Sequence, residues 1–198
     1  MLKFEKLTFL GPYLKKEPFL NKKQLALVGR SNVGKSSLIN HLCNNKKVAK
    51  VSSKPGKTQS ILFFKIDDTS QYLVDLPGYG FAKVSKKVKE GFSEEVKKYF
   101  EDQQDSLLVL LLLDIRHLPS EKDRQTVEWL NYYQIPYIAV FTKSDKLKPK
   151  EIEQQTQAIY KSFISFNPIS YVNYSIKDAK CRKILIHQIN QFYYGTPS

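Results

Sequence analysis

The first residues that could do chemistry form a short segment rich in glycine. Residues 29–36, GRSNVGKS, fit the pattern G-x-x-x-x-G-K-[ST] between an apolar run at 24–28 and a helical pattern at 34–43. In such a loop, backbone N–H groups and the N-terminus of the following helix attract phosphate. Lys35 would reach the β- and γ-phosphates, and the Ser36 hydroxyl would bind Mg²⁺. The predicted phosphate-binding residues are Gly29, Arg30, Ser31, Asn32, Val33, Gly34, Lys35, Ser36 and Ser37.

A second group of residues could complete a magnesium site. Asp75 follows the apolar residues 72–74, where a carboxylate can hold Mg²⁺, usually through a water. Alone it could simply begin a Pro-Gly turn, but it lies about 40 residues after the glycine-rich loop. Thr58 could join the metal only when a γ-phosphate is present, and the Gly78 N–H could meet that phosphate. The predicted metal ligands are Ser36, Thr58 and Asp75; the catalytic residues are Lys35, Thr58 and Gly78; and further nucleotide contacts are Gly56, Lys57, Thr58, Gln59, Ser60, Asp75, Leu76, Pro77 and Gly78.

A third group of residues would select the nucleotide base. The glycine-rich pattern does not select it, because ATPases share that pattern. Thr142-Lys143-Ser144-Asp145 follows the apolar run 137–141. The carboxylate of Asp145 can accept two hydrogen bonds that guanine offers and adenine does not, and a wrong base would leave it unpaired. The Lys143 stem would lie across the base. Most GTPases have Asn where Thr142 stands, so a charged loop that caps a strand is the alternative. After the last strand, a backbone N–H at Ser175 would meet the guanine O6, and Tyr174 and Ile176 on either side are further predicted nucleotide contacts.

The residue after Gly78 bears on the rate of hydrolysis. In Ras-like enzymes it is a Gln that orients the attacking water, whereas here it is Tyr79, which has no amide. Catalysis would depend on Mg²⁺, Lys35 and backbone donors, so we expect the isolated protein to be slow. Asn32 has two interpretations: it helps to hold K⁺ near the bridge between the β- and γ-phosphates, or it stabilises the loop through a bond to the backbone.

The elements that must position these groups alternate along the chain. Strand patterns lie at 24–28, 61–66, 72–76, 107–113, 137–141 and 169–174, and helical patterns at 34–43, 120–133, 150–163 and 178–192. Ser120, with Asp123 three residues later, opens one helix in a capping pattern. We therefore predict an α/β fold of three layers: a doubly wound, mostly parallel six-stranded sheet with one antiparallel edge strand. Residues 1–22 would be an extension packed on a single nucleotide-binding domain at 23–195.

Composition limits the class of protein. The 198 residues are 41% hydrophobic and 13% aromatic, which suits one globular domain. No apolar run approaches the ~20 residues of a membrane helix, and the first twenty residues lack the apolar core of a signal peptide. The two cysteines cannot form a disulfide framework. We expect a cytoplasmic monomer that does not insert into a membrane.

The charge is strongly basic. There are 32 Lys and Arg residues against 19 Asp and Glu, for a net charge of +13 and an isoelectric point near 9.5. Lysines gather at 46–57, 83–89, 146–150 and 177–183. Either lysine is the general solubilising residue of this proteome, or these clusters bind a polyanion, with nucleic acid or an anionic membrane surface as the candidates.

Taken together, the motifs resemble those of the EngB (YihA/YsxC) family of P-loop GTPases, in the TRAFAC class. The segments that carry the resemblance are 29–40 (GRSNVGKSSLIN), 53–59 (SKPGKTQ), 75–85 (DLPGYGFAKVS), 114–119 (DIRHLP) and 142–145 (TKSD). The resemblance implies binding of GTP and GDP, action on the large ribosomal subunit and its rRNA during assembly, and a link to cell division and septation. The family usually has a Ser-Ser pair where this chain has Ser175-Ile176, so the base contact there departs from the pattern. Two functions stay open: an enzyme whose turnover drives an assembly step, or a ribosome-binding switch in which hydrolysis only resets binding.

Overall fold

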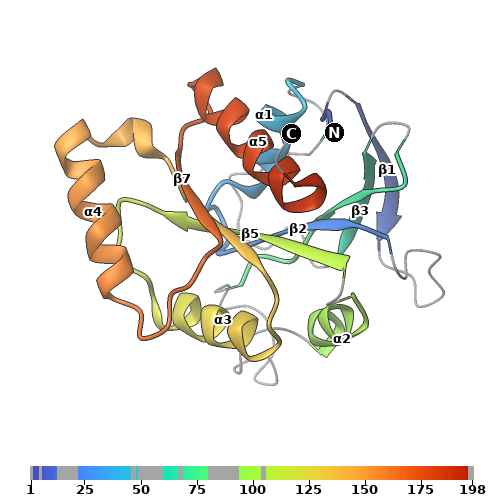
Figure 1. The fold of residues 1–198 in the computed structure, drawn as a ribbon, viewed down its shortest axis with the longest axis horizontal. Coiled ribbons are helices and arrows are strands. Elements are labelled where there is room, and N and C mark those ends of the chain that lie inside the picture. Colours follow the sequence, from blue (N-terminus) through green and yellow to red (C-terminus); the bar gives the residue numbers. More distant parts are fainter. Residues whose placement is uncertain are drawn as a thin grey trace.

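The computed structural model of this chain describes residues 2–4, 6–12, 22–45, 48, 60–66, 69–79, 94–103 and 106–195. Within these residues a seven-stranded sheet has the strand order β1-β3-β4-β2-β5-β6-β7 (Figure 1). The strands are β1 (Leu7–Pro12), β2 (Gln24–Gly29), β3 (Leu62–Ile66), β4 (Tyr72–Asp75), β5 (Leu107–Asp114), β6 (Tyr137–Thr142) and β7 (Ser170–Tyr174).

Six of the seven strands point the same way, and five of these, β2 and β4 to β7, pair in parallel with one another. β2 pairs in parallel with β4 and β5, β5 with β6, and β6 with β7, whereas β3 is antiparallel to both of its neighbours, β4 and β1. β5 lies between β2 and β6 and is buried from Leu107 to Leu113, as expected of a strand covered on both faces. The carboxyl ends of the five parallel strands therefore meet at one edge of the sheet.

Helices cover the two faces of this sheet (Figure 1). Alternate residues of β5 show the division: Leu108 and Leu110 pack in one core with α1 (Lys35–Leu42) and α5 (Ala179–Tyr194). Val109 and Leu111 pack in the other core, with α2 (Glu94–Gln103), α3 (Glu121–Tyr132) and α4 (Pro149–Lys161). The predicted α/β class and three layers are confirmed. None of the helices in the described part of the chain is long and apolar enough to cross a membrane.

The predicted start of α3 is confirmed in detail. The Ser120 backbone N–H donates to Asp123 Oδ2 at 2.7 Å, and the Asp123 N–H donates to Ser120 Oγ at 3.4 Å, which forms a reciprocal capping box. The helix α5 begins after Asp178, whose carboxylate accepts from the Lys180 N–H at 2.8 Å.

The sheet has seven strands, so the predicted number of six is wrong. The additional strand is β1, and it pairs with β3, which consequently lies second from the edge. An edge strand buries little side-chain surface, and β1 buries none of its residues completely, so it lacks the alternating pattern that reveals a strand in sequence. A register shift between Phe9 and Gly11, where Gly11 has φ 117°, interrupts the pairing further.

One helix was not predicted. α2 is absent from the sequence-based elements, although Val96, Tyr99 and Phe100 have the i, i+3, i+4 spacing of a buried helix face. Ahead of β1, Leu2 is buried, and its backbone N–H and C=O both bond to the Asn190 side chain in α5. The proposed domain division at residue 22 stays a prediction.

Candidate functional site

The predicted site residues gather at the edge where the parallel strands end. Gly29 ends β2, Asp75 ends β4, Thr142 ends β6 and Tyr174 ends β7. In open α/β sheets this edge is where ligands bind. Ser60 lies at a bend just before β3. The predicted residues Gly56, Lys57, Thr58 and Gln59 fall outside the described residues.

The glycine-rich loop has the backbone that its sequence requires. A Cβ on Gly29 would lie 2.8 Å from the Leu112 carbonyl oxygen, so only glycine fits against β5 there. Gly34 has φ 115° and precedes the first residue of α1, while Asn32 has φ 64°, a left-handed conformation that Asn tolerates better than most residues. The first N–H groups of α1 have no partner within the helix and face the loop. The loop can therefore present backbone donors to an anion.

Lys35 and Asp75 are both buried beside this loop. The Lys35 ammonium donates to the Gly29 carbonyl at 3.2 Å, and burial lowers its pKa against the opposing field of Asp75. Asp75 is 3% exposed, and its Oδ1 has no hydrogen-bond partner in the described part of the chain. Burial raises the pKa of Asp75 to about 6, although the Lys35 charge acts in the opposite direction. Such a buried carboxylate oxygen without a partner is unfavourable unless a cation or another donor occupies the site.

The segment after Asp75 lies directly against the loop. A Cβ on Gly78 would be 2.9 Å from Lys35 Nζ and 3.0 Å from the Ser31 nitrogen, so Gly78 allows a very close approach. The Ser31 N–H donates to the Tyr79 carbonyl at 3.1 Å, which forms an isolated parallel bridge between Arg30 and Tyr79. The structure therefore holds Gly78 next to the lysine that is predicted to reach the phosphates.

The Tyr79 side chain is turned into the core. It is 8% exposed, and its hydroxyl donates to Asp123 Oδ1 at 2.7 Å, at the start of α3. Burial, and then the negative charge of Asp123, raise the pKa of Tyr79 well above its usual value. Asp123 thus serves both the α3 capping box and the segment that carries Gly78. Sequence analysis missed this link because residues 79 and 123 meet only in the fold.

We expect Tyr79→Phe to lower the free energy of unfolding by about 1–2 kcal/mol, because a buried carboxylate oxygen loses its donor. Urea denaturation measures this. Tyr133→Phe is the matched control, because the Tyr133 hydroxyl donates to exposed Glu101 at 3.0 Å and water can replace it. The control should change stability by less than ~0.5 kcal/mol. Equal effects in the two variants would show that the bond to Asp123 does not anchor the segment.

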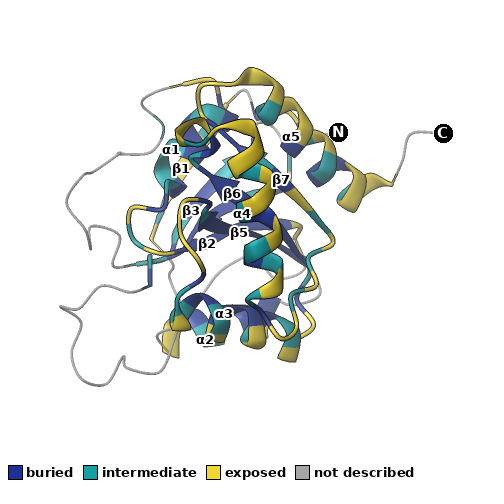
Figure 2. Cartoon of the chain, turned by 90° about the vertical axis from the view of Figure 1, so that its left-hand side faces the viewer, coloured by how far each residue is buried: buried dark blue, intermediate teal, exposed yellow. Residues whose placement is uncertain are grey.

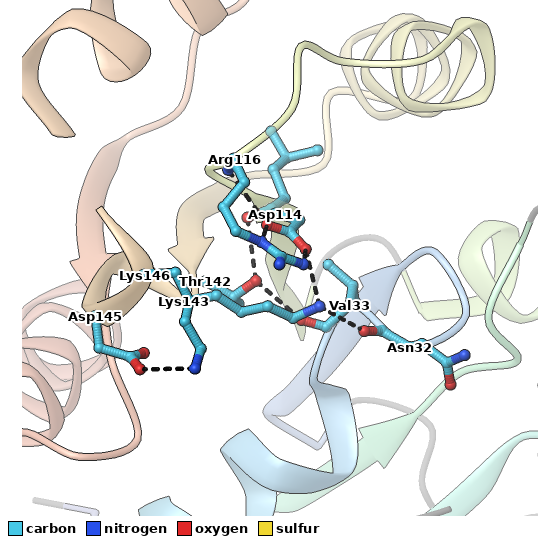
Figure 3. A network of polar contacts seen from close by, with 9 residues as sticks. Asn32, Val33, Asp114, Arg116, Thr142, Lys143, Asp145 and Lys146 are labelled. Atoms are coloured by element: carbon cyan, nitrogen blue, oxygen red, sulfur yellow. Dashed lines mark hydrogen bonds and ion pairs between the residues drawn. The ribbon is translucent and has the colours of Figure 1, made fainter. Parts of the chain in front are cut away.

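The side chain of Thr142 joins three elements of the site (Figure 3). Its hydroxyl lies 2.9 Å from the Val33 carbonyl and 3.2 Å from the Leu113 carbonyl, and it can donate to one of them at a time. A hydroxyl donor here ties the end of β6 to the glycine-rich loop. The departure from the usual Asn therefore leaves a side-chain donor in place.

Lys143 is held by groups from two other segments. Its ammonium donates to the Asn32 carbonyl at 3.0 Å and lies 2.8 Å from Asp114 Oδ2 (Figure 3). Asp114 also accepts from Arg116 through both of its oxygens, at 2.9 and 2.7 Å. Burial opposes the ionisation of Asp114, but the bonds from Arg116 and Lys143 outweigh it and lower its pKa well below its usual value. Asp114 therefore stays charged and fixes the Lys143 stem.

Asp145 faces the loop that follows β7. The Ser175 hydroxyl donates to Asp145 Oδ1 at 3.1 Å, and the Lys177 ammonium lies 3.2 Å from Oδ2. Burial opposes the ionisation of Asp145, but these two partners lower its pKa overall. Ser175 is buried, whereas Ile176 is 52% exposed. The Tyr174 hydroxyl turns the other way, 2.7 Å from His41 Nδ1 in α1. Of the three predicted residues 174–176, Ser175 is therefore the one whose side chain contacts Asp145.

Asp114 and a cavity beside it, both at this edge of the sheet, were not predicted as parts of the site. Asp114 ends an apolar strand just as Asp75 does, so the same sequence signal could have identified it. A cavity of about 400 Å³ lies between the glycine-rich loop and the segment 114–119; its lining includes Arg30, Asn32, Asp114, His117, Pro119 and Lys143. Ser31 and Val33 also line it, so the cavity overlaps the glycine-rich part of the predicted nucleotide site and extends from there toward the segment 114–119.

Comparisons with known proteins find similarity to GTP-binding proteins. A family model described as "50S ribosome-binding GTPase" matches residues 24–143. The "Probable GTP-binding protein EngB" of Desulforamulus reducens is 40% identical over 174 residues, which cover 88% of this chain and 85% of that protein. The protein of the same name from Prosthecochloris aestuarii is 44% identical over 179 residues, which cover 90% and 92%.

Solved structures are also similar. The crystal structure of a probable GTP-binding protein engB matches with a TM-score of 0.63 at 23% identity, over 85% of this chain and 97% of that one. The structure of Era in complex with MgGDPNP and nucleotides 1506–1542 of 16S ribosomal RNA matches with a TM-score of 0.65 at 26% identity, over 89% and 58%.

The fold of these neighbours is that of the P-loop GTPases. The chain belongs to the EngB family of GTP-binding proteins. A P-loop enzyme that hydrolyses GTP is therefore the class of activity, and Mg²⁺ is the metal that this class generally uses.

Proposed function

We propose that this chain binds GTP with Mg²⁺ at the carboxyl edge of the sheet, hydrolyses it slowly, and acts in the assembly of the large ribosomal subunit. The observation that carries the proposal is the placement of two carboxylates with different environments. Asp75 is buried beside Lys35 without a hydrogen-bond partner in the described residues, while Asp145 is fixed and ionised beside the loop after β7. The first suits a metal with phosphates, and the second suits a base.

The residues at the phosphate end fit Mg²⁺. Oxygen ligands are what this ion prefers, and the partnerless Oδ1 of Asp75 lies beside the loop that carries Ser36. Ser36, Asp75 and, outside the described residues, Thr58 would hold the ion. When bound, Mg²⁺ would neutralise negative charge on the phosphate oxygens. Lys35 would turn from the Gly29 carbonyl toward the phosphates, and the Gly78 N–H would donate to the γ-phosphate.

The residues at the base end fit guanine. Asp145 would accept from N1–H and the exocyclic amine, while Ser175 keeps its carboxylate oriented through Oδ1. The Lys143 stem, fixed at its end by Asp114 and Asn32, would lie against the plane of the base. Adenine lacks the two donors, so it would leave the Asp145 carboxylate unpaired.

Slow hydrolysis follows from the position of Tyr79. Its phenol is hydrogen-bonded to Asp123 in the core, so it supplies no group to orient an attacking water. Backbone donors of the loop, Lys35 and the metal would then stabilise the charge on the transferring phosphoryl group. A stimulating partner or a monovalent cation would be needed for faster turnover.

Potassium is the proposed cation. The Asn32 side chain is exposed, makes no hydrogen bond to the described residues, and points away from Lys143 in Figure 3. We expect hydrolysis to be faster in K⁺ than in Na⁺ at equal ionic strength, and Asn32→Ala to remove the difference. Phosphate release measured in the two salts tests this. Asn44→Ala is the control, because Asn44 also has a positive φ (49°) but lies beyond α1. Equal rates of the wild-type protein in both salts would leave Asn32 with a loop-stabilising role only.

The ribosomal role is supported by the comparisons. The matching family model is described as 50S ribosome-binding, and the similar structure of Era contains 16S ribosomal RNA. Co-sedimentation with isolated ribosomal subunits, with GDP or a non-hydrolysable GTP analogue, tests the proposal. We expect binding to the large subunit that is stronger with the analogue. Sedimentation with neither subunit in either nucleotide would contradict it. The family link to cell division and septation is part of the same proposal.

A second function is a ribosome-binding switch in which hydrolysis only resets binding. The sequestered Tyr79 favours it, because its hydroxyl is bonded to Asp123 and does not orient water. In this version the lysine groups at 46–57 and 83–89 would bind rRNA when the γ-phosphate orders their segments. Apart from Val48, these two groups lie outside the described residues, so this gating stays a prediction. Assembly that proceeds with the non-hydrolysable analogue would favour the switch, and assembly that requires turnover would favour the enzyme.

A further inference from the structure

Charge is distributed unevenly over the helices of this protein. The α5 sequence contains Lys180, Arg182 and Lys183 and no acidic residue. By contrast, α2 has four acidic residues against two lysines, and α3 has three acidic residues against two basic ones. α2 and α3 lie on the opposite face of the sheet from α5 (Figure 1), so of these three helices the basic one covers one face and the two acidic ones cover the other.

Two lysine groups that are separate in sequence meet in the fold at Asp145. Lys177 Nζ lies 3.2 Å and Lys146 Nζ lies 3.9 Å from the same oxygen, Asp145 Oδ2. Their side chains are 69% and 54% exposed, so the ammonium groups still face water. The neighbouring lysines lie in or just before α4 and α5, which pack on opposite faces of the sheet and both carry exposed residues (Figure 2). We call the exposed lysines of the two groups the base-side lysine face: Lys146, Lys148, Lys150, Lys177, Lys180 and Lys183.

The exposed stripe of α5 continues this face. Positions three or four residues apart share one side of a helix, and those that are exposed here extend over about 20 Å. The stripe consists of Lys180, Lys183, Ile184, His187, Gln191 and Tyr194. It combines cations with hydrogen-bonding and aromatic groups, as nucleic-acid-binding surfaces do. A helix that lies in a membrane surface would need a broad apolar side instead.

We propose that the base-side lysine face binds the sugar–phosphate backbone of ribosomal RNA. The inference rests on the proposed ribosomal function and names the surface that makes the contact. The face adjoins the guanine-recognising loops and not the segment that would sense the γ-phosphate. Its affinity for RNA alone should therefore agree within about twofold between GDP and a GTP analogue, because the nucleotides differ only at the far end. Each lysine–phosphate contact releases counterions, so binding should weaken steeply with salt.

Two triple variants with the same loss of charge test the face. Lys150→Gln/Lys180→Gln/Lys183→Gln removes three exposed cations from it, and none of these residues belongs to the nucleotide site. Lys98→Gln/Lys122→Gln/Lys161→Gln removes three from the outer sides of α2, α3 and α4. The probe is rRNA extracted from large ribosomal subunits, titrated in filter-binding assays between about 50 and 300 mM KCl.

We expect the first variant to bind the rRNA at least ~10-fold more weakly near 100 mM KCl, with the slope of log K against log salt reduced by about 2–3. The control should bind within about twofold of wild type, because its lysines lie elsewhere. Lys150→Arg/Lys180→Arg/Lys183→Arg keeps the charge and should bind as wild type. Unchanged melting temperatures and GTP affinity establish that the variants are folded.

Equal loss of binding in the two Gln variants would contradict the proposal, because only net charge would then matter. Binding of the wild type to vesicles of phosphatidylcholine with about 30% phosphatidylglycerol, without binding to rRNA, would also contradict it and make a lipid surface the polyanion. If the wild type sediments with large subunits and the first Gln variant does so equally, the face is a solvated surface and the ribosomal function stands. If the wild type binds neither subunits nor rRNA, the ribosomal function itself fails.

Discussion

Asp145→Asn should lose most of its affinity for GTP and gain affinity for xanthosine triphosphate. The amide can accept from N1–H through its oxygen, but its NH₂ group would oppose the guanine amine and favour the carbonyl of xanthine. We expect a loss of about 2–4 kcal/mol for GTP, or roughly 30- to 1,000-fold in Kd. Titration with fluorescent analogues of the two nucleotides measures both changes.

The control for this variant is Asp178→Asn, which makes the same change of charge in the neighbouring loop, after β7. Asp178 accepts from the Lys180 N–H as the first residue before α5, and Asn is an equally good residue at such a position. Its GTP affinity should stay within about twofold of wild type. If Asp145→Asn binds GTP as well as the control does, the carboxylate does not read the base, and the loop merely caps β6.

Asp75→Asn should make the nucleotide-free protein more stable while nearly abolishing hydrolysis. The buried carboxylate has no hydrogen-bond partner among the described residues, so its ionised form destabilises the fold. We expect a gain of about 1–3 kcal/mol at pH 7.5 in urea denaturation with EDTA present. Hydrolysis of GTP should fall by at least ~100-fold, because the metal would lose a ligand or the water that this ligand holds.

The pH dependence of this gain provides the internal control. The pKa of Asp75 is about 6 in the folded protein, above its value in the unfolded chain, so the folded state takes up the proton first. As the pH falls through 6 toward 4, wild-type Asp75 becomes neutral, and the advantage of the Asn variant should shrink. Unchanged stability together with normal hydrolysis would show that Asp75 only begins a Pro-Gly turn.

Much of the fold could be predicted because its signals are local. The run 107–113 is too apolar for anything but a strand buried on both faces, and Ser120 with Asp123 defines a helix start by spacing alone. β1 could not be predicted in the same way, because it lies at the edge of the sheet. Phe9 is 55% exposed, and its ring packs against that of Phe64 with 5.3 Å between the ring centroids.

The motif residues of the site could be predicted from sequence, but the contacts that hold them in place could not. Lys35, Asp75 and Asp145 each lie beside a strand end and could be placed from sequence. The residues that hold the site in place come from distant segments. Asp114 fixes Lys143, Asp123 anchors Tyr79, and Ser175 orients Asp145. No local pattern indicates such contacts, since they depend on which strands become neighbours.

Phosphate release by the wild-type protein from GTP and from ATP, each with Mg²⁺ or with EDTA, is the most direct test of the proposed base and metal sites. We expect slow release from GTP, below about 0.01 per second, because neither a water-orienting Gln nor a partner is present. Release should require Mg²⁺, and ATP should give none above background. Comparable release from ATP, or release from GTP that EDTA does not stop, would contradict the assignment of Asp145 to the base and of Asp75 to the metal.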